Sequence, residues 1–506
     1  MSHAIASLYR LLLASAPSDP SAPMLISPDG TRLSHGEAHH LAGRLARGLA
    51  TCGAVPGDRV SVRADKSPTS VLLYLACLRG GFVYVPFNTA YTEDELAYLI
   101  GDAEPAVMVG RPEDEAFLNA QAARHGARAV LTLAADGGGS VRDLMASERC
   151  EGAPADLRPD DLAAMLYTSG TTGKPKGAML TQDNLAANGL ALAEAWRFQA
   201  DDVLLHALPL FHAHGLFVAC HTTWLAGASM LWLPGFDRDR VLDLLPQATV
   251  FMGVPTFYTR LLADPRLTAE RVAGMRLFVS GSAPLLAETH RAFEERTGKA
   301  ILERYGMTET GMNTSNPYDG PRRPGAVGPA LPGVSVRVVD EEGAEVPAET
   351  VGDVQVKGRN VMKGYWKLPE KTREEFTADG WFKTGDVGRI DAEGYLHIVG
   401  RAKDLIISGG YNVYPKEVED VIDALDGVVE SAVVGVPHPD FGEVGVAVVV
   451  TRGAVDEAKV LAHCKAHLAN YKVPKNAFFV VDLPRNTMGK VQKALLRDTY
   501  KGLFAG

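Results

Sequence analysis

The stretch that decides the fold is YTSGTTGKPKG, residues 167–177. It follows the apolar run 163–166 and contains three glycines, three threonines, one serine and two lysines. Glycine allows close backbone approaches, while hydroxyls, backbone N–H groups and lysine bind phosphate oxygens. An apolar run followed by such a loop predicts a buried strand that delivers a polyphosphate-binding loop.

This loop differs from a Walker P-loop, which requires G-x-x-x-x-G-K-[ST]. Only two residues separate Gly170 from Gly173, and Pro175 follows Lys174 where Ser or Thr is required. A helix is predicted to begin only after Thr181, a favourable N-cap residue. The alternative, a surface linker, is disfavoured because linkers seldom follow a buried strand. The stretch therefore predicts phosphate binding of a non-Walker kind.

The composition indicates a globular protein of two or more domains, with 506 residues, 46% hydrophobic and 22% charged. The sequence has no run of 18 apolar residues, so no membrane helix is predicted. The N-terminus lacks the cationic start that a signal peptide would have. The net charge of −10 disfavours nucleic acid as the main partner. Five cysteines without C-x-x-C spacing indicate a reducing compartment, and a cytoplasmic location is expected.

Strand and helix patterns alternate through roughly the first 320 residues, which predicts parallel, doubly wound sheets covered by helices. Beyond them, dense glycines and prolines indicate a β-rich subdomain. A boundary is expected near residue 400, followed by a small α+β domain of mixed helices and strands. The predicted fold class is α/β, with a large N-terminal domain and a small mobile C-terminal domain.

Five further polar, glycine-punctuated stretches interrupt the apolar elements. They are GSAPL (281–285), RYGMTET (304–310), WFKTGDVG (381–388), GRAKDLIISGGYNVYPKEVE (400–419) and PRNTMGK (484–490). The Glu309 carboxylate is suited to hold Mg²⁺ against phosphate oxygens. Asp386 is suited to accept hydrogen bonds from ribose hydroxyls. Lys490 lies in the predicted C-terminal domain, so a catalytic role for it requires domain closure.

Taken in order, the stretches 167–180, 305–310, 381–388, 400–419 and 484–490 resemble the motifs of the ANL superfamily of adenylate-forming enzymes, and the resemblance covers essentially the whole chain. That superfamily contains acyl-CoA synthetases, peptide-synthetase adenylation domains and luciferases. Residues 205–219 and 303–328 are most similar to malonyl-CoA synthetases. The resemblance implies two steps: ATP and a carboxylate give acyl-AMP and pyrophosphate, and the CoA thiol then displaces AMP.

The resemblance also implies a nucleotide site. ATP and AMP would be bound by Thr168, Ser169, Gly170, Thr171, Thr172, Gly173, Lys174, Ser282, Ala283, Pro284, Glu303, Arg304, Tyr305, Gly306, Met307, Thr308, Asp386 and Arg401. Within this set, Tyr305 would stack on adenine and Thr308 would meet the α-phosphate. Asp386 and Arg401 would hold the ribose.

Catalysis is assigned by the resemblance to Lys490, Glu309, Thr308 and Lys174. Glu309 and Thr168 would hold Mg²⁺, and Lys490 would bridge the acyl oxygen and the phosphate. Attack of a carboxylate on the α-phosphate brings two anions together. Catalysis is therefore mainly positioning and charge neutralisation, without a nucleophilic side chain.

The C-terminal motifs imply movement and CoA binding. Lys403 falls at the family's hinge position, so we expect residues 401–403 to join a domain of residues 1–400 to a lid of residues 404–506. Gly409 and Gly410 would line the pantetheine tunnel. The stretch 484–490 also resembles a motif recognised by lysine acetyltransferases in this family, which predicts acetylation of Lys490.

The acyl pocket implied by the resemblance contains His212, Ser282, Met307, Arg238 and Arg304. Malonate keeps one free carboxylate after adenylation, and burying that charge is costly unless an arginine pairs with it. Arg304 directly precedes Tyr305. Arg238 follows a strand end and is slightly preferred as the partner of the second carboxylate. The alternative for Arg238 is a surface ion pair. The other histidines of residues 206–221 are expected in the core or at its rim.

The sequence thus predicts an AMP-forming malonate–CoA ligase. Its alternatives are a CoA ligase for methylmalonate or for a short-chain or aryl acid, and a stand-alone adenylation enzyme that loads another thiol. A non-catalytic nucleotide-binding relative is disfavoured because Lys490, Glu309 and Asp386 are all present.

Overall fold

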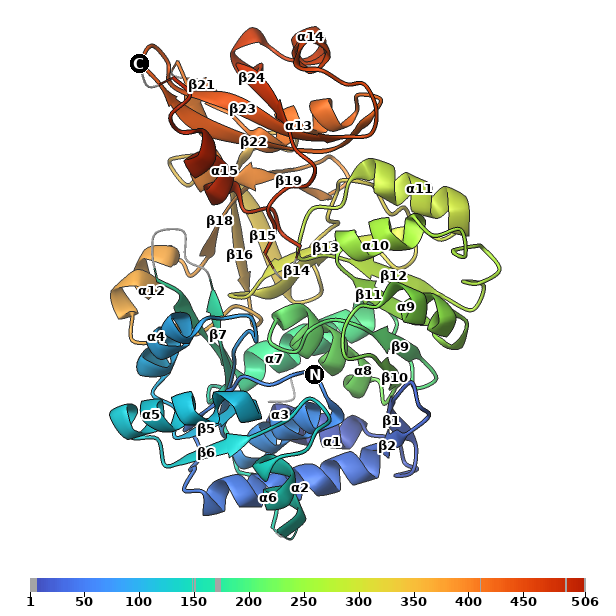
Figure 1. Ribbon diagram of the computed structural model, residues 1–506, viewed down its shortest axis with the longest axis vertical. Coiled ribbons are helices and arrows are strands. Elements are labelled where there is room, and N and C mark those ends of the chain that lie inside the picture. Colours follow the sequence, from blue (N-terminus) through green and yellow to red (C-terminus); the bar gives the residue numbers. More distant parts are fainter. Residues whose placement is uncertain are drawn as a thin grey trace. The chain divides into compact units, whose positions relative to one another are not determined.

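The computed structural model describes residues 7–147, 149, 152–168, 174–409, 411–486 and 489–504. The chain divides into two compact units (Figure 1). Unit 1 comprises Met1–Ser335 and Val356–Phe382, and unit 2 comprises Val336–Gln355 and Lys383–Gly506. Each unit has its own sheets and apolar core.

Unit 1 is built on two mainly parallel sheets. In order across the first sheet, the strands are β14 (Gly311–Ser315), β13 (Ile301–Met307), β12 (Leu277–Ser280), β11 (Val250–Gly253), β9 (Val203–His206), β10 (Ser229–Trp232), β1 (Pro23–Ile26) and β2 (Arg32–Ser34). Those of the second are β17 (Gly364–Tyr365), β8 (Lys176–Thr181), β7 (Leu162–Thr168), β4 (Val83–Pro86), β3 (Arg59–Val62), β5 (Val107–Gly110) and β6 (Ala129–Thr132). Antiparallel strands occur at the edges of both sheets.

Helices cover these sheets. They are α1 (Leu8–Ser15), α2 (His35–Thr51), α3 (Pro68–Gly80), α4 (Glu93–Ala103), α5 (Glu115–His125), α6 (Ser140–Ser147), α7 (Gln182–Ala195), α8 (Cys220–Leu225), α9 (Arg238–Leu244), α10 (Pro255–Leu262), α11 (Ala287–Thr297) and α12 (Pro369–Glu375). Shorter turns are the 3₁₀ helices η1 (Pro112–Asp114) and η3 (Leu245–Gln247) and the π-helix η2 (His214–Ala219).

Local sequence explains where several of these helices begin. Ser34, Ser67, Thr92 and Thr181 each form a capping box at the start of α2, α3, α4 and α7, which satisfies backbone N–H groups of the first turn. Thr181 is thus the N-cap that the sequence predicts. Helices α2 and α3 pack against each other (Figure 1).

Aromatic residues fill the core beside the first sheet. Phe278 packs edge-on against Phe293 with ring centroids 4.9 Å apart, and Tyr258 packs edge-on against Phe293 at 5.4 Å. Each of these rings buries a large apolar area and favours this edge-to-face geometry. The resulting core keeps β12 and β13 rigid where their ends carry site residues.

Unit 2 contains most of a four-stranded sheet and a five-stranded sheet. The first has β15 (Val334–Val339), β16 (Gly352–Gly358), β18 (Phe382–Ile390) and β19 (Leu396–Arg401); the second has β21 (Tyr411–Val413), β20 (Ile406–Ser408), β23 (Gly442–Thr451) and β22 (Val428–His438), with β24 (Asn476–Phe479) beside β23. The helices are α13 (Pro415–Asp423), α14 (Glu457–His467), α15 (Lys493–Tyr500), η4 (Ala402–Asp404) and η5 (Asn470–Lys472).

The five-stranded sheet of unit 2 has an apolar core on each face. Val433 and Val449 belong to the core that includes residues of α13 and α14, whereas Val434 and Val448 belong to the core that includes Leu496 of α15. Adjacent strand residues point to opposite faces, so continuous valine runs bury both faces at once.

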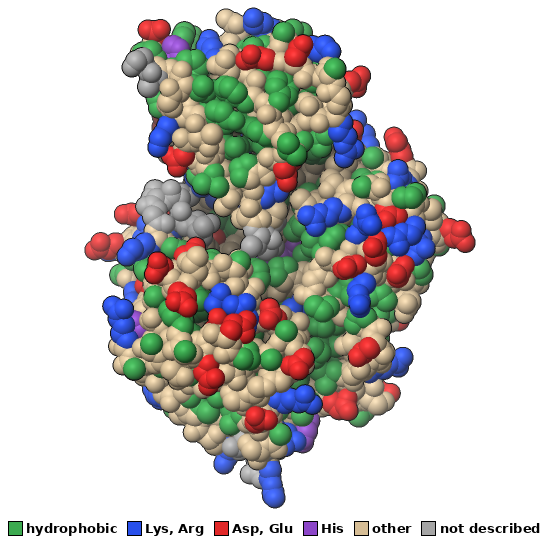
Figure 2. Space-filling model, viewed as in Figure 1, with side chains coloured by type: hydrophobic (Ala, Val, Ile, Leu, Met, Phe, Trp, Pro, Cys, Tyr) green, Lys and Arg blue, Asp and Glu red, His purple; other side chains and the backbone are tan. Residues whose placement is uncertain are grey.

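The predicted α/β fold class is confirmed: doubly wound sheets, a β-rich part and an α+β part are all present. The domain boundary near residue 400 and the hinge at 401–403 stay predictions. Among the described helices, none has both the length and the apolar character of a membrane span. Acidic and basic side chains are interspersed on the face shown in Figure 2.

Candidate active site

A buried arginine defines the first part of the site in unit 1. Arg304 lies on β13 with 4% of its surface exposed, and its guanidinium packs against the backbone of Gly281, just beyond β12. A Cβ on Gly281 would lie 2.3 Å from Arg304 Cζ, so only glycine leaves room for the guanidinium. Within the described part of the chain, Nε and Nη2 of Arg304 have no hydrogen-bond partner.

This setting is electrostatically unfavourable for a cation. Burial lowers the pKa of Arg304 to about 9, against a smaller raising effect of Tyr258. Buried charges in proteins are normally paired, and buried N–H groups are normally hydrogen-bonded. An unpaired guanidinium of this kind is suited to receive an anion.

Two polar side chains complete what we call the anion pocket, defined as Arg304, His214 and Ser282. Ser282 adopts a left-handed backbone conformation with φ +71°, which is uncommon for a residue other than glycine and is found preferentially at functional sites. Its Oγ lies 3.2 Å from Nδ1 of His214, the first residue of η2. His214 Nε2 has no partner among the described residues.

His214 is held neutral by its surroundings. Burial lowers the pKa of His214 well below its ordinary value, and the charge of Arg304 lowers it further. A neutral imidazole that carries its proton on Nε2 adds a hydrogen-bond donor to the pocket without adding charge. From the sequence, His214 is expected in the core or at its rim and not at a site. Its spacing of two residues from His212 is the one feature of the sequence that could have indicated a site.

The two candidate arginines differ in burial and in their ion-pair partners. Arg238 begins α9 and has 46% of its side chain exposed, and it pairs with Asp239 at 3.0 Å and Asp264 at 3.2 Å. Its guanidinium is therefore already neutralised at the surface. The geometry favours Arg304 over Arg238 as the partner of a buried carboxylate, the reverse of the order expected from the sequence.

The other histidines of this region have structural partners. His212 Nδ1 accepts a hydrogen bond from the backbone N–H of His214 at 3.2 Å, and His221 Nε2 lies 2.7 Å from the Tyr74 hydroxyl. His206 and His221 are both buried, as predicted. The role of His212 in the acyl pocket stays a prediction.

Strand β13 and the loop after it carry the residues assigned to the nucleotide. Glu303 is buried; its Oε1 lies 3.2 Å from His290 Nδ1 and accepts a hydrogen bond from Gly325 N at 3.2 Å. Tyr305 and Met307 follow on the same strand and are partly exposed. A Cβ on Gly306 would lie 2.0 Å from Gly311 O, so this close approach requires glycine. Ala283 and Pro284 follow Ser282 in the loop after β12.

A carboxylate lies close to the end of this segment. Glu309 is 6% exposed and accepts a hydrogen bond from the Tyr365 hydroxyl at 3.0 Å. A carboxylate oxygen is a ligand that Mg²⁺ prefers, and the role of Glu309 in binding this ion stays a prediction. Tyr365 was not anticipated, because no sequence motif marks it.

The phosphate loop is described only at its two ends. Thr168 ends β7 and pairs with Lys176 on β8, and Lys174 Nζ lies 4.8 Å from the centroid of the Tyr98 ring. The predicted phosphate-binding residues 169–173 lie outside the described residues. Their role, like that of Lys174, stays a prediction.

Unit 2 brings the C-terminal motif residues into one charged cluster. Arg401 on β19 pairs with Asp386 on β18, with Nε 2.6 Å from Oδ1. Desolvation of its amine lowers the pKa of Lys490, with Arg401 and Lys403 adding to the effect and Asp386 opposing it, although the residue as a whole is exposed. Burial also lowers the pKa of Lys403. Residues far apart in sequence therefore lie near one another within this unit.

Gly409, the first of the two predicted CoA-binding glycines, directly follows β20. Gly409 has φ +57°, and its N–H donates to Phe441 O at 2.8 Å. This left-handed conformation is one that glycine adopts without strain. Gly410 lies outside the described residues, and the contact of both glycines with pantetheine stays a prediction.

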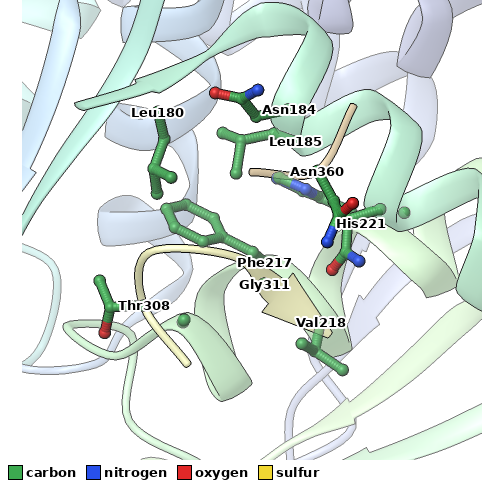
Figure 3. Close-up of a pocket in the computed structure, with 12 residues that line it drawn as sticks. Leu180, Asn184, Leu185, Phe217, Val218, His221, Thr308, Gly311 and Asn360 are labelled. Atoms are coloured by element: carbon green, nitrogen blue, oxygen red, sulfur yellow. The ribbon is translucent and has the colours of Figure 1, made fainter. Parts of the chain in front are cut away.

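A small cavity lies beside Thr308 in unit 1 (Figure 3). Leu180, Leu185, Phe217 and Val218 give it apolar walls, and its volume is ≈ 10 Å³. That is room for about one water molecule.

Comparison with known proteins places this geometry in a family. The family model "AMP-binding enzyme" matches residues 12–366, and "AMP-binding enzyme C-terminal domain" matches residues 417–490. The crystal structure of ATP-bound MatB from Rhodopseudomonas palustris is 56% identical, with a TM-score of 0.97 and 99% of each chain covered.

Curated relatives agree with the family and differ in their acids. The sulfoacetate–CoA ligase of Cupriavidus necator is 38% identical over 97% of both chains. The malonate–CoA ligase of Arabidopsis thaliana is 35% identical over 89% of this chain and 79% of the relative. Together with the match of the family model to most of its length, these likenesses show that the chain belongs to the AMP-binding, adenylate-forming enzymes that the ordered motifs resemble.

Proposed function

We propose that this enzyme is an AMP-forming malonate–CoA ligase that works through malonyl-AMP. The observation that carries the proposal is the buried Arg304, two of whose N–H groups have no partner among the described residues. The second carboxylate of malonate supplies an anion of matching shape, since a guanidinium binds a carboxylate through two parallel hydrogen bonds. The malonate–CoA ligase relative supports the same acid.

In the first step one carboxylate of malonate attacks the α-phosphorus of ATP. An O–P bond forms, the bond to the bridging oxygen of the β-phosphate breaks, and pyrophosphate leaves. Arg304 holds the other carboxylate, so the attacking oxygen is oriented. Lys490 offsets the negative charge that grows on the phosphate.

In the second step the CoA sulfur attacks the acyl carbon of malonyl-AMP. The carbon–sulfur bond forms, the bond from the acyl carbon to AMP oxygen breaks, and AMP leaves with its electron pair. The ion pair of Asp386 with Arg401 presents a carboxylate for the ribose hydroxyls. Lys403, in the turn η4 directly after Arg401, is the proposed pivot between the two steps.

Magnesium fits the carboxylate that the structure offers. Mg²⁺ in phosphoryl-transfer enzymes uses one or two carboxylates together with substrate phosphates. Glu309 is a buried carboxylate at the end of the segment that carries Tyr305 and Thr308, and Thr168 is the described end of the phosphate loop. When bound, the ion would neutralise phosphate charge during pyrophosphate departure.

Sulfoacetate is the second candidate acid, favoured by the sulfoacetate–CoA ligase relative and by the same unpaired guanidinium. A sulfonate is also an anion with several acceptor oxygens, and one face of it meets a guanidinium much as a carboxylate does. Methylmalonate keeps both carboxylates and adds one methyl group. Propionate and benzoate lack the second charge.

An AMP-release assay with and without CoA tests the proposal. We expect the highest kcat/KM with malonate or methylmalonate, release of AMP that requires CoA, and little activity with propionate or benzoate. A preference for sulfoacetate would move the assignment to the second candidate. Equal activity with propionate and malonate would overturn the proposed role of Arg304.

Two narrower proposals rest on sequence. Acetylation of Lys490 by a lysine acetyltransferase depends on a segment, 484–490, that is only partly within the described residues. A cytoplasmic location depends on the cysteines, and the four described ones, Cys52, Cys77, Cys220 and Cys464, are free thiols. Mass spectrometry of enzyme from its native cells would test the first proposal, and cell fractionation the second.

A further inference from the structure

A lysine behind the anion pocket has no role in the reaction described above. Lys66 lies between β3 and Ser67, the N-cap of α3. Its Nζ lies 2.7 Å from His206 Nδ1 and 2.8 Å from His206 O. It also lies 4.2 Å from the centroid of the Trp232 ring, and burial lowers the pKa of Lys66 well below its ordinary value. The amine thus connects the second sheet of unit 1, at β3, to the first sheet, at β9.

The hydrogen bonds of His206 are compatible with one tautomer. His206 Nε2 lies 2.9 Å from Gly215 O. A carbonyl oxygen only accepts, so Nε2 must carry the hydrogen. Nδ1 is then the bare nitrogen and accepts from the amine of Lys66. Burial and the neighbouring Lys66 lower the pKa of His206 well below its ordinary value, which agrees with a neutral ring.

The carbonyl that receives this hydrogen bond belongs to the turn that carries His214. Gly215 is the second residue of η2 and directly follows His214. A Cβ on Gly215 would lie 2.0 Å from Pro209 O, so the turn packs closely against the loop before it. Cys220 Sγ donates to the same Gly215 carbonyl at 3.2 Å. The position of His214, and hence its contact with Ser282, depends on this turn.

We propose that Lys66 is a positioning residue for substrate specificity: through His206 it holds the start of η2 so that His214 faces Ser282 in the anion pocket. The proposal rests on the proposed function, because the pocket is assigned there to the distal acidic group of the substrate. Lys66 itself acts through His206. Its loss should therefore weaken binding of an acid with a second negative charge and leave ATP binding unchanged.

The test compares Lys66→Met and His206→Phe with the wild type. Methionine keeps the unbranched stem of lysine and removes the donor. We expect KM for malonate to rise about ten-fold, the scale of one hydrogen bond involving a charged group, with KM for ATP and kcat/KM for propionate unchanged. The double variant should lose no more than either single variant, because neighbours in one hydrogen-bond network are not additive.

A second readout follows the histidine directly. In ¹⁵N NMR of histidine-labelled enzyme, the His206 signal, identified by its loss in His206→Phe, should show the Nε2–H tautomer. In Lys66→Met we expect a mixture of tautomers. His206→Asn, which offers one acceptor and one donor, should restore part of the malonate affinity. Lys363→Met removes an exposed lysine paired with Asp160 at 2.6 Å and serves as the matched control.

Two results would overturn the inference. One is a parallel loss with malonate, propionate and ATP in Lys66→Met, which would show a structural role alone. The other is an unchanged His206 tautomer in that variant. A wild type that does not prefer malonate to propionate would instead refute the proposed function, and the tautomer measurement would still decide whether Lys66 controls His206.

Discussion

Replacing Arg304 by methionine is the sharpest test of the anion pocket. In the free enzyme burial lowers the pKa of Arg304 to about 9, far below the ordinary value of an arginine. At about 1.36 kcal/mol per pKa unit, the charged form is disfavoured by about 5 kcal/mol before substrate binds. A substrate carboxylate offsets this cost by pairing with the guanidinium, so the arginine contributes to binding of a dicarboxylate and not of a monocarboxylate.

Truncating one partner of a buried charge pair costs about 2–5 kcal/mol. Arg304→Met should therefore reduce kcat/KM for malonate by at least about 30-fold, whereas propionate should react as well as before or better. The variant should melt no lower than the wild type, because an unpaired buried charge destabilises the free enzyme. Arg304→Lys should be intermediate, since lysine keeps the charge but loses the planar fork.

The assay is AMP release with malonate and propionate in parallel, combined with thermal melting. Arg238→Ala is the matched control, because its guanidinium is already paired with Asp264 and Asp239 at the surface. A similar loss with both acids in Arg304→Met would refute the reasoning and indicate that the arginine only supports the fold. A malonate-specific loss in Arg238→Ala would restore that residue as the carboxylate partner.

Three further predictions concern unit 2. Lys490→Ala should slow pyrophosphate release by about 10²–10³-fold and spare thioester formation from supplied malonyl-AMP; equal losses in both half-reactions would contradict the assignment. Lys403→Pro should still form malonyl-AMP but fail to transfer it to CoA, because proline fixes φ at the proposed pivot; normal CoA turnover would exclude Lys403 as the pivot. Burial raises the pKa of Asp423 to about 7, so its contribution to stability is present below about pH 4 and is lost as pH rises to about 7. Asp423→Asn should therefore raise the melting temperature at pH 8 more than at pH 4, and an equal shift at both pH values would show that the carboxylate is not the cause.

The sequence predicts a nucleotide-binding half of the site because the residues that it assigns there lie in short, contiguous motifs. Tyr305 through Glu309 follow one another along one strand and the loop after it. Their spacing in RYGMTET therefore indicates a common site. Asp386 and Arg401 lie on neighbouring strands in two such motifs, and the structure pairs them at 2.6 Å. The doubly wound fold was predictable for a similar reason, since alternating strand and helix patterns have few compatible topologies.

The sequence by itself determined the fold class and the family, since these depend on local order along the chain; the nucleotide-site residues that it indicates stay predictions. Only the tertiary structure distinguishes Arg304 from Arg238, because both are arginines after an apolar run and differ in burial and partners; the role of Arg304 as the carboxylate partner stays a proposal. It also joined Lys66 to His206 across 140 residues. Packing of two sheets creates that contact, and pairings between distant segments leave no periodic signal in a single sequence.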